Sequence, residues 1–244
     1  MDTTASKRST GRSRGWWAWL IGVPLTVAFL LAGLWIFAGV LAPGYYASFV
    51  LAAGWSRRFG RPKALLPCGP AGESFVVRAV RTLRSGGIAE VLVIGRPEDD
   101  ALRQEVGRVV PPARYVENPN AAEGQLSSLL AGLAQATAAG AAAVMVIPVD
   151  YPQVRAETVA ALLRALDAGG ASIVRAVHRG RHGHPVIFTE DVFADLRRAD
   201  PAVGAKAVIR ANPARLLDVE VGDPGVLRDV DVPADYVDLF PDSE

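Results

Sequence analysis

Short apolar runs alternate with amphipathic segments along the chain, and this alternation restricts the possible fold more than any other sequence feature. Residues 90–95 and 143–149 are rich in valine and isoleucine and carry almost no polar side chains, as strands buried on both faces usually do. The segments 123–138 and 155–168 repeat leucine or valine at positions i, i+3, i+4 and i+7, the spacing of one helix face. Strands alternating with helices of this size predict a parallel α/β sheet covered on both faces.

Weaker patterns extend this sheet. Further strands are predicted at residues 48–50, 114–117, 171–177, 185–189 and 216–221, and further helices at residues 73–84 and 99–109. The last three strands follow one another closely, which is typical of a mixed sheet. We therefore expect a three-layer α/β domain over residues 48–240, with a mixed, mainly parallel sheet. A chain of 244 residues has room for this domain and one attached segment.

The excess of positive charge lies at the N-terminus, where residues 1–15 form a basic tail. The first 47 residues have a net charge of +3, from Lys7, Arg8, Arg12 and Arg14 against Asp2. The remaining residues have a net charge of −2, whereas a nucleic-acid-binding domain is usually basic. We therefore expect no nucleic-acid partner.

Residues 16–42 are uncharged and long enough to cross a membrane as an N-terminal hydrophobic helix. Aromatic residues at both ends match the belts found at membrane interfaces: Trp16, Trp17, Trp19, Tyr45 and Tyr46. The segment therefore predicts a membrane anchor, and two alternatives stay open. A secretory signal peptide fits less well because its apolar region is usually about 7–15 residues long. A translation start inside or after the segment would make the apolar stretch an artefact of the chosen start.

A basic, glycine-containing loop at residues 51–66 follows the first predicted strand and reads Leu-Ala-Ala-Gly-Trp-Ser-Arg-Arg-Phe-Gly-Arg-Pro-Lys-Ala-Leu-Leu. Glycine allows close approach of the backbone, and successive N–H groups in a tight loop bind anions. Arg57, Arg58 and Lys63 add positive charge. The loop matches neither G-x-x-x-x-G-K-[ST] nor G-x-G-x-x-G. From its residues alone, it fits either an ordinary turn or a phosphate site.

The loop resembles the signature L-A-A-G-x-S-x-R-[FM]-G-x-P-K-x-L-L of the MobA-like NTP transferases, in the branch of the molybdenum cofactor cytidylyltransferases. The likeness continues to about residue 239. It implies a GT-A-like, Rossmann-like nucleotidyltransferase fold. It also implies transfer of a nucleoside monophosphate to a phosphorylated acceptor, with release of pyrophosphate.

The resemblance assigns roles within this loop. It implies that Lys63 and Arg58 act on the phosphates in catalysis. It implies nucleotide binding by Leu51, Ala52, Ala53, Gly54, Ser56, Arg57 and Gly60, and by Gly124 and Ser128 of a second motif, N-P-x-x-x-x-G-x-x-x-S-L. Related guanylyltransferases usually have L-A-G-G and D-K, whereas this chain has Ala52-Ala53-Gly54 and Pro62-Lys63. CTP is therefore the expected nucleotide.

Asp150 ends an apolar strand and precedes Tyr151-Pro152, which by itself fits a turn or a helix cap. The resemblance matches it to the acidic D-x-P residue that would hold Mg²⁺ on the triphosphate. Residues 229–236 resemble the family's D-[IV]-D-T-P-E-D-[LY] element, with Val232 and Ala234 replacing threonine and glutamate. Asp229 or Asp231 would supply the second metal-facing carboxylate, with Asp231 preferred.

Residues 180–188 resemble G-x-x-G-H-P-V-x-F, which implies that Gly183, His184 and Pro185 face a molybdopterin-type acceptor. His182 and His184 do not predict a zinc site, because only His178 is near them and the single cysteine, Cys68, does not pair with them.

Two other functions remain open at the level of sequence. A sugar-phosphate nucleotidyltransferase shares much of the loop. An inactive, membrane-tethered nucleotide-binding module would lack Asp150 or Lys63, and both are present. The basic tail favours an outward-facing domain, but Arg57, Arg58, Arg61 and Lys63 beyond the span can reverse this orientation. Since the reaction needs a nucleoside triphosphate, we expect a cytoplasmic domain anchored in the inner (plasma) membrane by residues 16–42.

Overall fold

The computed structural model describes residues 45–69 and 72–241. The basic tail and the membrane helix predicted at residues 16–42 lie outside this range. Among the described residues, no helix has the length and apolar character needed to span a bilayer.

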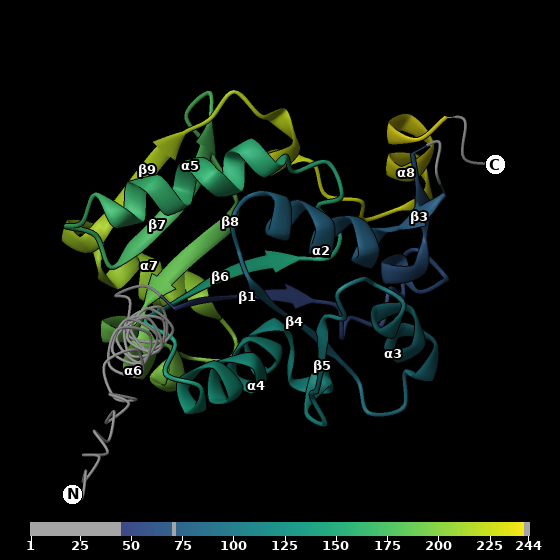
Figure 1. The fold of residues 1–244 in the computed structure, drawn as a ribbon, viewed down its shortest axis with the longest axis horizontal. Helices are drawn as coiled ribbons and strands as arrows, with labels where there is room; N and C mark the ends of the chain where they lie inside the picture. Colours follow the sequence, from purple (N-terminus) through teal and green to yellow (C-terminus); the bar gives the residue numbers. More distant parts are fainter. Residues whose placement is uncertain (1–44, 70–71, 242–244) are drawn as a thin grey trace, which may run out of the picture. The chain divides into compact units, whose positions relative to one another are not determined.

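A seven-stranded sheet, ordered β5-β4-β1-β6-β8-β7-β9, forms the centre of the domain (Figure 1). Its strands are β1 (Tyr46–Leu51), β4 (Glu90–Gly95), β5 (Arg114–Glu117), β6 (Ala143–Pro148), β7 (Ile173–His178), β8 (Arg181–Thr189) and β9 (Leu216–Glu220). Only β8 runs antiparallel to its neighbours, β6 and β7. The predicted mixed, mainly parallel sheet is therefore confirmed.

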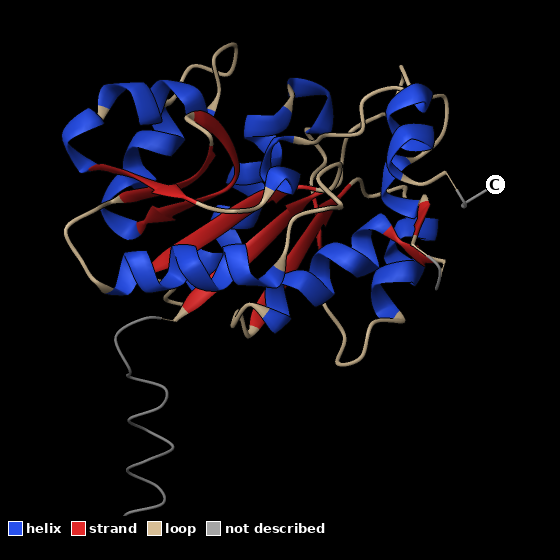
Figure 2. Cartoon of the chain, turned by 90° about the horizontal axis from the view of Figure 1, so that it is seen from above, coloured by secondary structure: helices blue, strands red, loops and turns tan. Residues whose placement is uncertain are grey.

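Helices cover both faces of this sheet, and Figure 2 shows them alongside the strands. They are α2 (Phe75–Ser85), α3 (Asp100–Gly107), α4 (Gln125–Ala138), α5 (Ala156–Asp167), α6 (Phe193–Arg198), α7 (Ala205–Ala211) and α8 (Pro233–Leu239). One apolar core contains side chains of α2, α3 and α5, and the other contains side chains of α4, α6 and α7. These two cores, on opposite faces of one sheet, are the expected three layers.

The four predicted helices end within two residues of those observed, because their apolar spacing is regular. The short helices α6 and α7 were not predicted, since they span fewer than two full turns each. Strand β8 begins four residues before the predicted start at Pro185. The difference comes from a two-residue hairpin turn, in which Arg179 and Gly180 have φ of 51° and 73°. The sequence did not predict this turn, because its first position holds arginine, where Asn or Gly is usual.

The C-terminal helix α8 lies beside the small β2 (Pro67–Cys68) and β3 (Glu73–Ser74) ladder (Figure 1). Tyr236 of α8 is buried, donates a hydrogen bond to the Pro67 carbonyl at 2.7 Å and packs on Phe59 and Phe75. The Asp235 carboxylate accepts the N–H groups of Asp231 and Val232 at 2.8 Å each. The helix start thus keeps one side of a capping box, although Val232 has no oxygen to supply the other.

Two glycines give a test of how tightly the helices pack. A Cβ at Gly86, just after α2, would lie 2.4 Å from the Val159 Cβ of α5, whereas a Cβ at Gly107 would meet nothing within 4 Å. We expect Gly86→Ala to lower the free energy of unfolding by about 2–3 kcal/mol through overpacking. Gly107→Ala should raise it by about 0.5–1 kcal/mol through helix propensity. Denaturant unfolding measures both, and equal changes in the two variants would contradict this packing.

Candidate active site

A cleft of about 510 Å³ opens beyond the carboxyl ends of β1 and β6, where open α/β sheets bind ligands. Most of the residues predicted from the motifs line it: Leu51, Ala52, Ala53, Gly54, Ser56, Arg57, Arg58, Lys63, Gly124, Ser128, Asp150 and Asp231. Gly60, Gly183, His184 and Pro185 do not line it. The cleft thus brings together four motifs that are separated in the sequence.

The loop after β1 folds back on Ser56, which has a φ of 48°. The Ser56 carbonyl accepts the N–H groups of Phe59 and Gly60, and its hydroxyl oxygen accepts the Lys63 N–H at 3.1 Å. Gly60 has a φ of 80°, so its place in the motif is explained by the turn rather than by a contact with the cleft. This turn directs the Lys63 side chain towards the end of β6.

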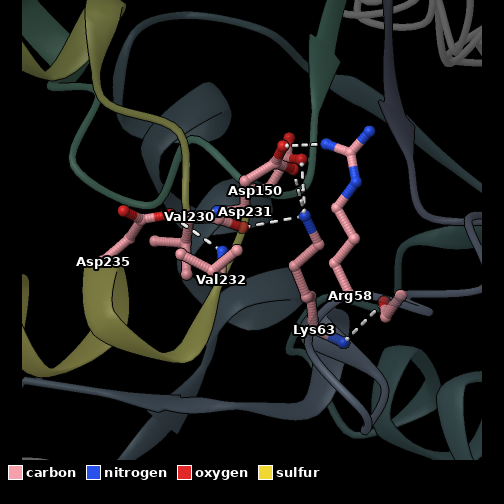
Figure 3. Close-up of polar contacts among 8 residues, drawn as sticks. Arg58, Lys63, Asp150, Val230, Asp231, Val232 and Asp235 are labelled. Atoms are coloured by element: carbon pink, nitrogen blue, oxygen red, sulfur yellow. Dashed lines mark hydrogen bonds and ion pairs between the residues drawn. The ribbon is translucent and has the colours of Figure 1, made fainter.

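The Lys63 ammonium lies among three oxygen acceptors, as Figure 3 shows. It donates to Asp150 Oδ2 at 3.1 Å, to the Val230 carbonyl at 2.8 Å and to Asp231 Oδ1 at 3.0 Å. Burial lowers the pKa of Lys63, but the charges and hydrogen bonds of Asp150 and Asp231 outweigh this and raise it above the usual value. The side chain is therefore a fixed cation in the cleft.

Arg58 forms a second ion pair with Asp231, on the solvent side of Lys63. Its Nη1 lies 2.9 Å from Asp231 Oδ2, and both side chains are exposed. The hydrogen bond from Lys63 lowers the pKa of Asp231 against the effect of burial, and the Arg58 charge lowers it further. Asp231 is thus ionised and shared by two cations.

Asp150 follows β6 directly and is held at its backbone, where its carbonyl accepts the Val230 N–H at 2.9 Å. Its Oδ1 is buried and meets no hydrogen-bond partner among the described residues. Burial raises the pKa of Asp150 above its usual value, the Lys63 ammonium opposes this, and the Asp229 charge adds to it. A buried carboxylate oxygen with no partner is the kind of group that a bound cation satisfies.

The N-terminus of α4 forms another wall of the cleft through Gly124 and Ser128. Gly124 has a φ of 99°, which a residue with a Cβ rarely adopts. The buried Asn118 side chain donates to the hydroxyl oxygens of Ser127 and Ser128 at 2.9 and 3.0 Å, and accepts the Asn120 N–H at 3.0 Å. Asn118 therefore fixes the loop that leads into the helix.

His184 and its neighbours Gly183 and Pro185 are not among the residues that line the cleft. The His184 ring packs edge-on against the Tyr151 ring, with 4.9 Å between the ring centroids. The Nδ1 atom of His184 is buried and has no hydrogen-bond partner among the described residues. Burial lowers the pKa of His184 to about 4. A Cβ at Gly183 would lie 2.1 Å from the Val226 carbonyl oxygen, so close packing already accounts for this glycine. Their predicted contact with an acceptor remains a prediction.

Sequence reasoning missed several groups at the cleft. The Val230 carbonyl has no sequence signal, because any residue could supply it. Trp55 and Asp99 line the cleft, and Arg96, just after β4, lies 4.3 Å from the Trp55 ring centroid. An exposed tryptophan inside a signature loop is the one signal that could have drawn attention to this group.

Comparisons with known proteins cover most of this domain. The family model described as "MobA-like NTP transferase domain" matches residues 48–217. A protein of Opitutus terrae named "Probable molybdenum cofactor guanylyltransferase" is 37% identical over 129 residues, which are 53% of this chain and 59% of that protein. The chain therefore spans less than two thirds of that relative's length.

Two further likenesses cover more of the chain. The "Purine catabolism protein PucB" of Bacillus subtilis is 27% identical over 199 residues, 79% of this chain and 94% of that protein. The crystal structure of Rv0371c from Mycobacterium tuberculosis superposes with a TM-score of 0.66 at 25% identity, covering 80% of this chain and 97% of the other.

The lowered pKa of His184 predicts a loss of stability in acid. In the unfolded chain its pKa is near 6.5, so that state takes up a proton as the pH falls while the folded state stays neutral down to about 4. This lowered pKa stabilises the fold above pH 6.5, and about 2 kcal/mol of stability is lost between pH 7 and pH 5.

The free energy of unfolding of His184→Gln, measured at pH 7 and pH 5, should lack this loss of about 2 kcal/mol. The variant His182→Gln, at an exposed position, should retain it. An unchanged pH dependence in His184→Gln would contradict the lowered pKa of His184.

Proposed function

Because this chain belongs to the family of MobA-like NTP transferase domains, we propose that it transfers a nucleoside monophosphate from a nucleoside triphosphate to a phosphorylated acceptor. The observation that carries the proposal is the meeting of Lys63 with Asp150 and Asp231 in a cleft lined by the signature loop. It supplies positive charge for the phosphates and carboxylates for a cation at one place, which phosphoryl transfer requires.

The proposed reaction is a direct displacement. A phosphate oxygen of the acceptor forms a bond to the α-phosphorus, and the bond between that phosphorus and the bridging oxygen to the β-phosphate breaks. Pyrophosphate leaves with the bonding electron pair. Lys63 and Arg58 neutralise charge on the α-phosphate and the leaving group, and the loop after β1 holds the triphosphate in line. Position and charge supply the catalysis, without a covalent intermediate.

Asp150 and Asp231 fit a magnesium site. Asp150 offers a buried oxygen without a partner, and two carboxylates completed by phosphates and water are the usual ligands of Mg²⁺. In this proposal, phosphate and water complete the shell of the ion. When bound, the ion neutralises phosphate charge.

We propose CTP as the nucleotide and a molybdopterin-type cofactor as the acceptor. Ala52-Ala53-Gly54 and Pro62-Lys63 support CTP. GTP is the second candidate, because the Opitutus terrae relative is named a guanylyltransferase. A sugar phosphate is the alternative acceptor. The need for a nucleoside triphosphate places the domain in the cytoplasm in this proposal, with anchoring by residues 16–42 as a further expectation.

Replacing Asp150 separates catalysis from folding. We expect Asp150→Asn to lower the rate of pyrophosphate release by about 100-fold or more, because the electrostatic support of the transferred phosphate is lost. The Tm should not fall, since the raised pKa of Asp150 indicates that its ionised form is less favourable in the folded than in the unfolded chain.

Asp195→Asn is the matched control, since Asp195 pairs with Arg198 on α6, outside the cleft. Retention of most activity by Asp150→Asn would refute the assigned role.

A substrate panel tests the class and the specificity together. Full-length protein with Mg²⁺ is incubated with CTP, GTP, UTP or ATP, each with and without molybdopterin, and pyrophosphate is measured. We expect release with CTP only when the pterin is present. Release with GTP would indicate the guanylyl reaction. A parallel set of reactions with a sugar phosphate in place of molybdopterin tests the other acceptor, which release in that set would indicate. Nucleotide binding without any release would favour the inactive module.

A further inference from the structure

Arg96 connects the signature loop to the rest of the domain. It directly follows β4, and its side chain is only 14% exposed. Its Nη1 donates to the carbonyls of Gly54 at 3.2 Å and Ala53 at 3.4 Å. Its other nitrogens bind Glu98 and Asp99, both at 3.1 Å, and its guanidinium lies over the Trp55 ring. All of its nitrogens are therefore engaged at fixed places.

The Arg96 backbone is fixed as well. The Tyr115 hydroxyl of β5 donates to the Arg96 carbonyl at 2.6 Å. Asp99, which holds Nη2, also accepts the Leu102 N–H as the N-cap of α3. Arg96 thus joins β4, β5 and α3 to one short stretch of the loop, and it can act as a rigid reference for that stretch.

The carbonyl contacts determine where the neighbouring amides point. In a trans peptide the C=O and the N–H lie in one plane and point in opposite directions. The Ala53 carbonyl shares its peptide with the Gly54 N–H, and the Gly54 carbonyl shares its peptide with the Trp55 N–H. Because both carbonyls face Arg96, both N–H groups face away from it.

These two amides are free to bind an anion. Neither the Gly54 nor the Trp55 N–H donates to an acceptor among the described residues, whereas the Ala52 N–H before them binds the Ile94 carbonyl at 2.9 Å. Gly54 and Trp55 both line the cleft that contains Lys63. Successive free N–H groups in a tight loop form an anion-binding concavity.

We propose that Arg96 is a positioning residue for the triphosphate: it holds the carbonyls of Ala53 and Gly54 so that the next two amides face the phosphates. The role rests on the proposed nucleotidyltransferase function and adds a residue that the loop motif does not contain. The Trp55 ring covers one face of the Arg96 guanidinium and shields that face from water.

Capping of α3 alone does not account for these contacts. Asp99 already caps α3 through the Leu102 N–H, and that bond does not require an arginine. The contacts that do require the fork of the guanidinium are those to the two loop carbonyls, because a lysine ammonium could not span Asp99, Glu98 and both carbonyls at once. Arg96→Lys therefore removes the orientation of the loop while retaining the charge.

Arg103 provides a matched control. It also lies over an aromatic ring, that of Tyr115 at 4.5 Å, and its Nη2 donates to the Pro97 carbonyl and to Glu117 at 2.9 Å each. It makes the same kinds of contact as Arg96 in the same region but does not contact the signature loop. Arg103→Lys thus reproduces the chemical change without the proposed effect.

The experiment compares the full-length wild type, Arg96→Lys and Arg103→Lys. The KM for the nucleoside triphosphate, the kcat and the inhibition constant of inorganic tripolyphosphate are measured for each. We expect Arg96→Lys to raise the KM and the tripolyphosphate inhibition constant by a similar factor, about 5- to 20-fold for two lost hydrogen bonds. The kcat should change by less than about threefold. Arg103→Lys should change none of the three constants by more than about twofold.

Hydrogen exchange of the wild type tests the same idea without a variant. Tripolyphosphate should slow exchange of the amides of Gly54 and Trp55, and unchanged exchange at bound tripolyphosphate would overturn the proposal. So would an Arg96→Lys variant with wild-type constants, or one whose tripolyphosphate inhibition is unchanged while only the kcat falls. A wild type that neither turns over a nucleotide nor binds tripolyphosphate would instead refute the proposed function.

Discussion

The contact of one ammonium with three oxygens from distant segments holds the cleft together. Lys63 joins the signature loop to Asp150 at the end of β6 and to the C-terminal segment at Val230 and Asp231. The pair with Asp150 is the stronger one, because the two side chains are 12% and 23% exposed, whereas Asp231 is 44% exposed and its pair is screened by solvent. Without the Lys63 ammonium, the buried Oδ1 and the Oδ2 of Asp150 would both lack a hydrogen-bond partner among the described residues.

The other contacts bring these groups to one place. The parallel pairing of β1 with β6 aligns Leu51 with Pro148, so the signature loop and Asp150 leave the sheet at the same edge. The Val230 N–H then binds the Asp150 carbonyl, and the buried Tyr236 holds α8 against the chain that follows the loop. Backbone pairing and aromatic packing therefore place the charges, and the charges contribute less to the fold than the packing does.

The sequence predicted the sheet and most of the cleft because the relevant signals are local. Apolar periodicity gave the buried strands and the long helices, and the motif gave the residues that leave β1 and β6. The function of Arg96 could not be predicted in this way, since its partners are backbone carbonyls, which any residue could supply. The surroundings of His184 could not be predicted for a related reason: the sequence does not show that Val226 and Tyr151 pack around the G-H-P segment.

The closing contacts of the cleft join parts of the chain that are far apart in synthesis. The Lys63 side chain reaches Val230 and Asp231 across 167 and 168 residues. Contacts of such separation form late, because the intervening chain must be ordered first. A ribosome-bound chain that already displays the signature loop therefore lacks the C-terminal side of the cleft. The competence to hold a triphosphate is in this way acquired only after Val230 and Asp231 have been synthesised.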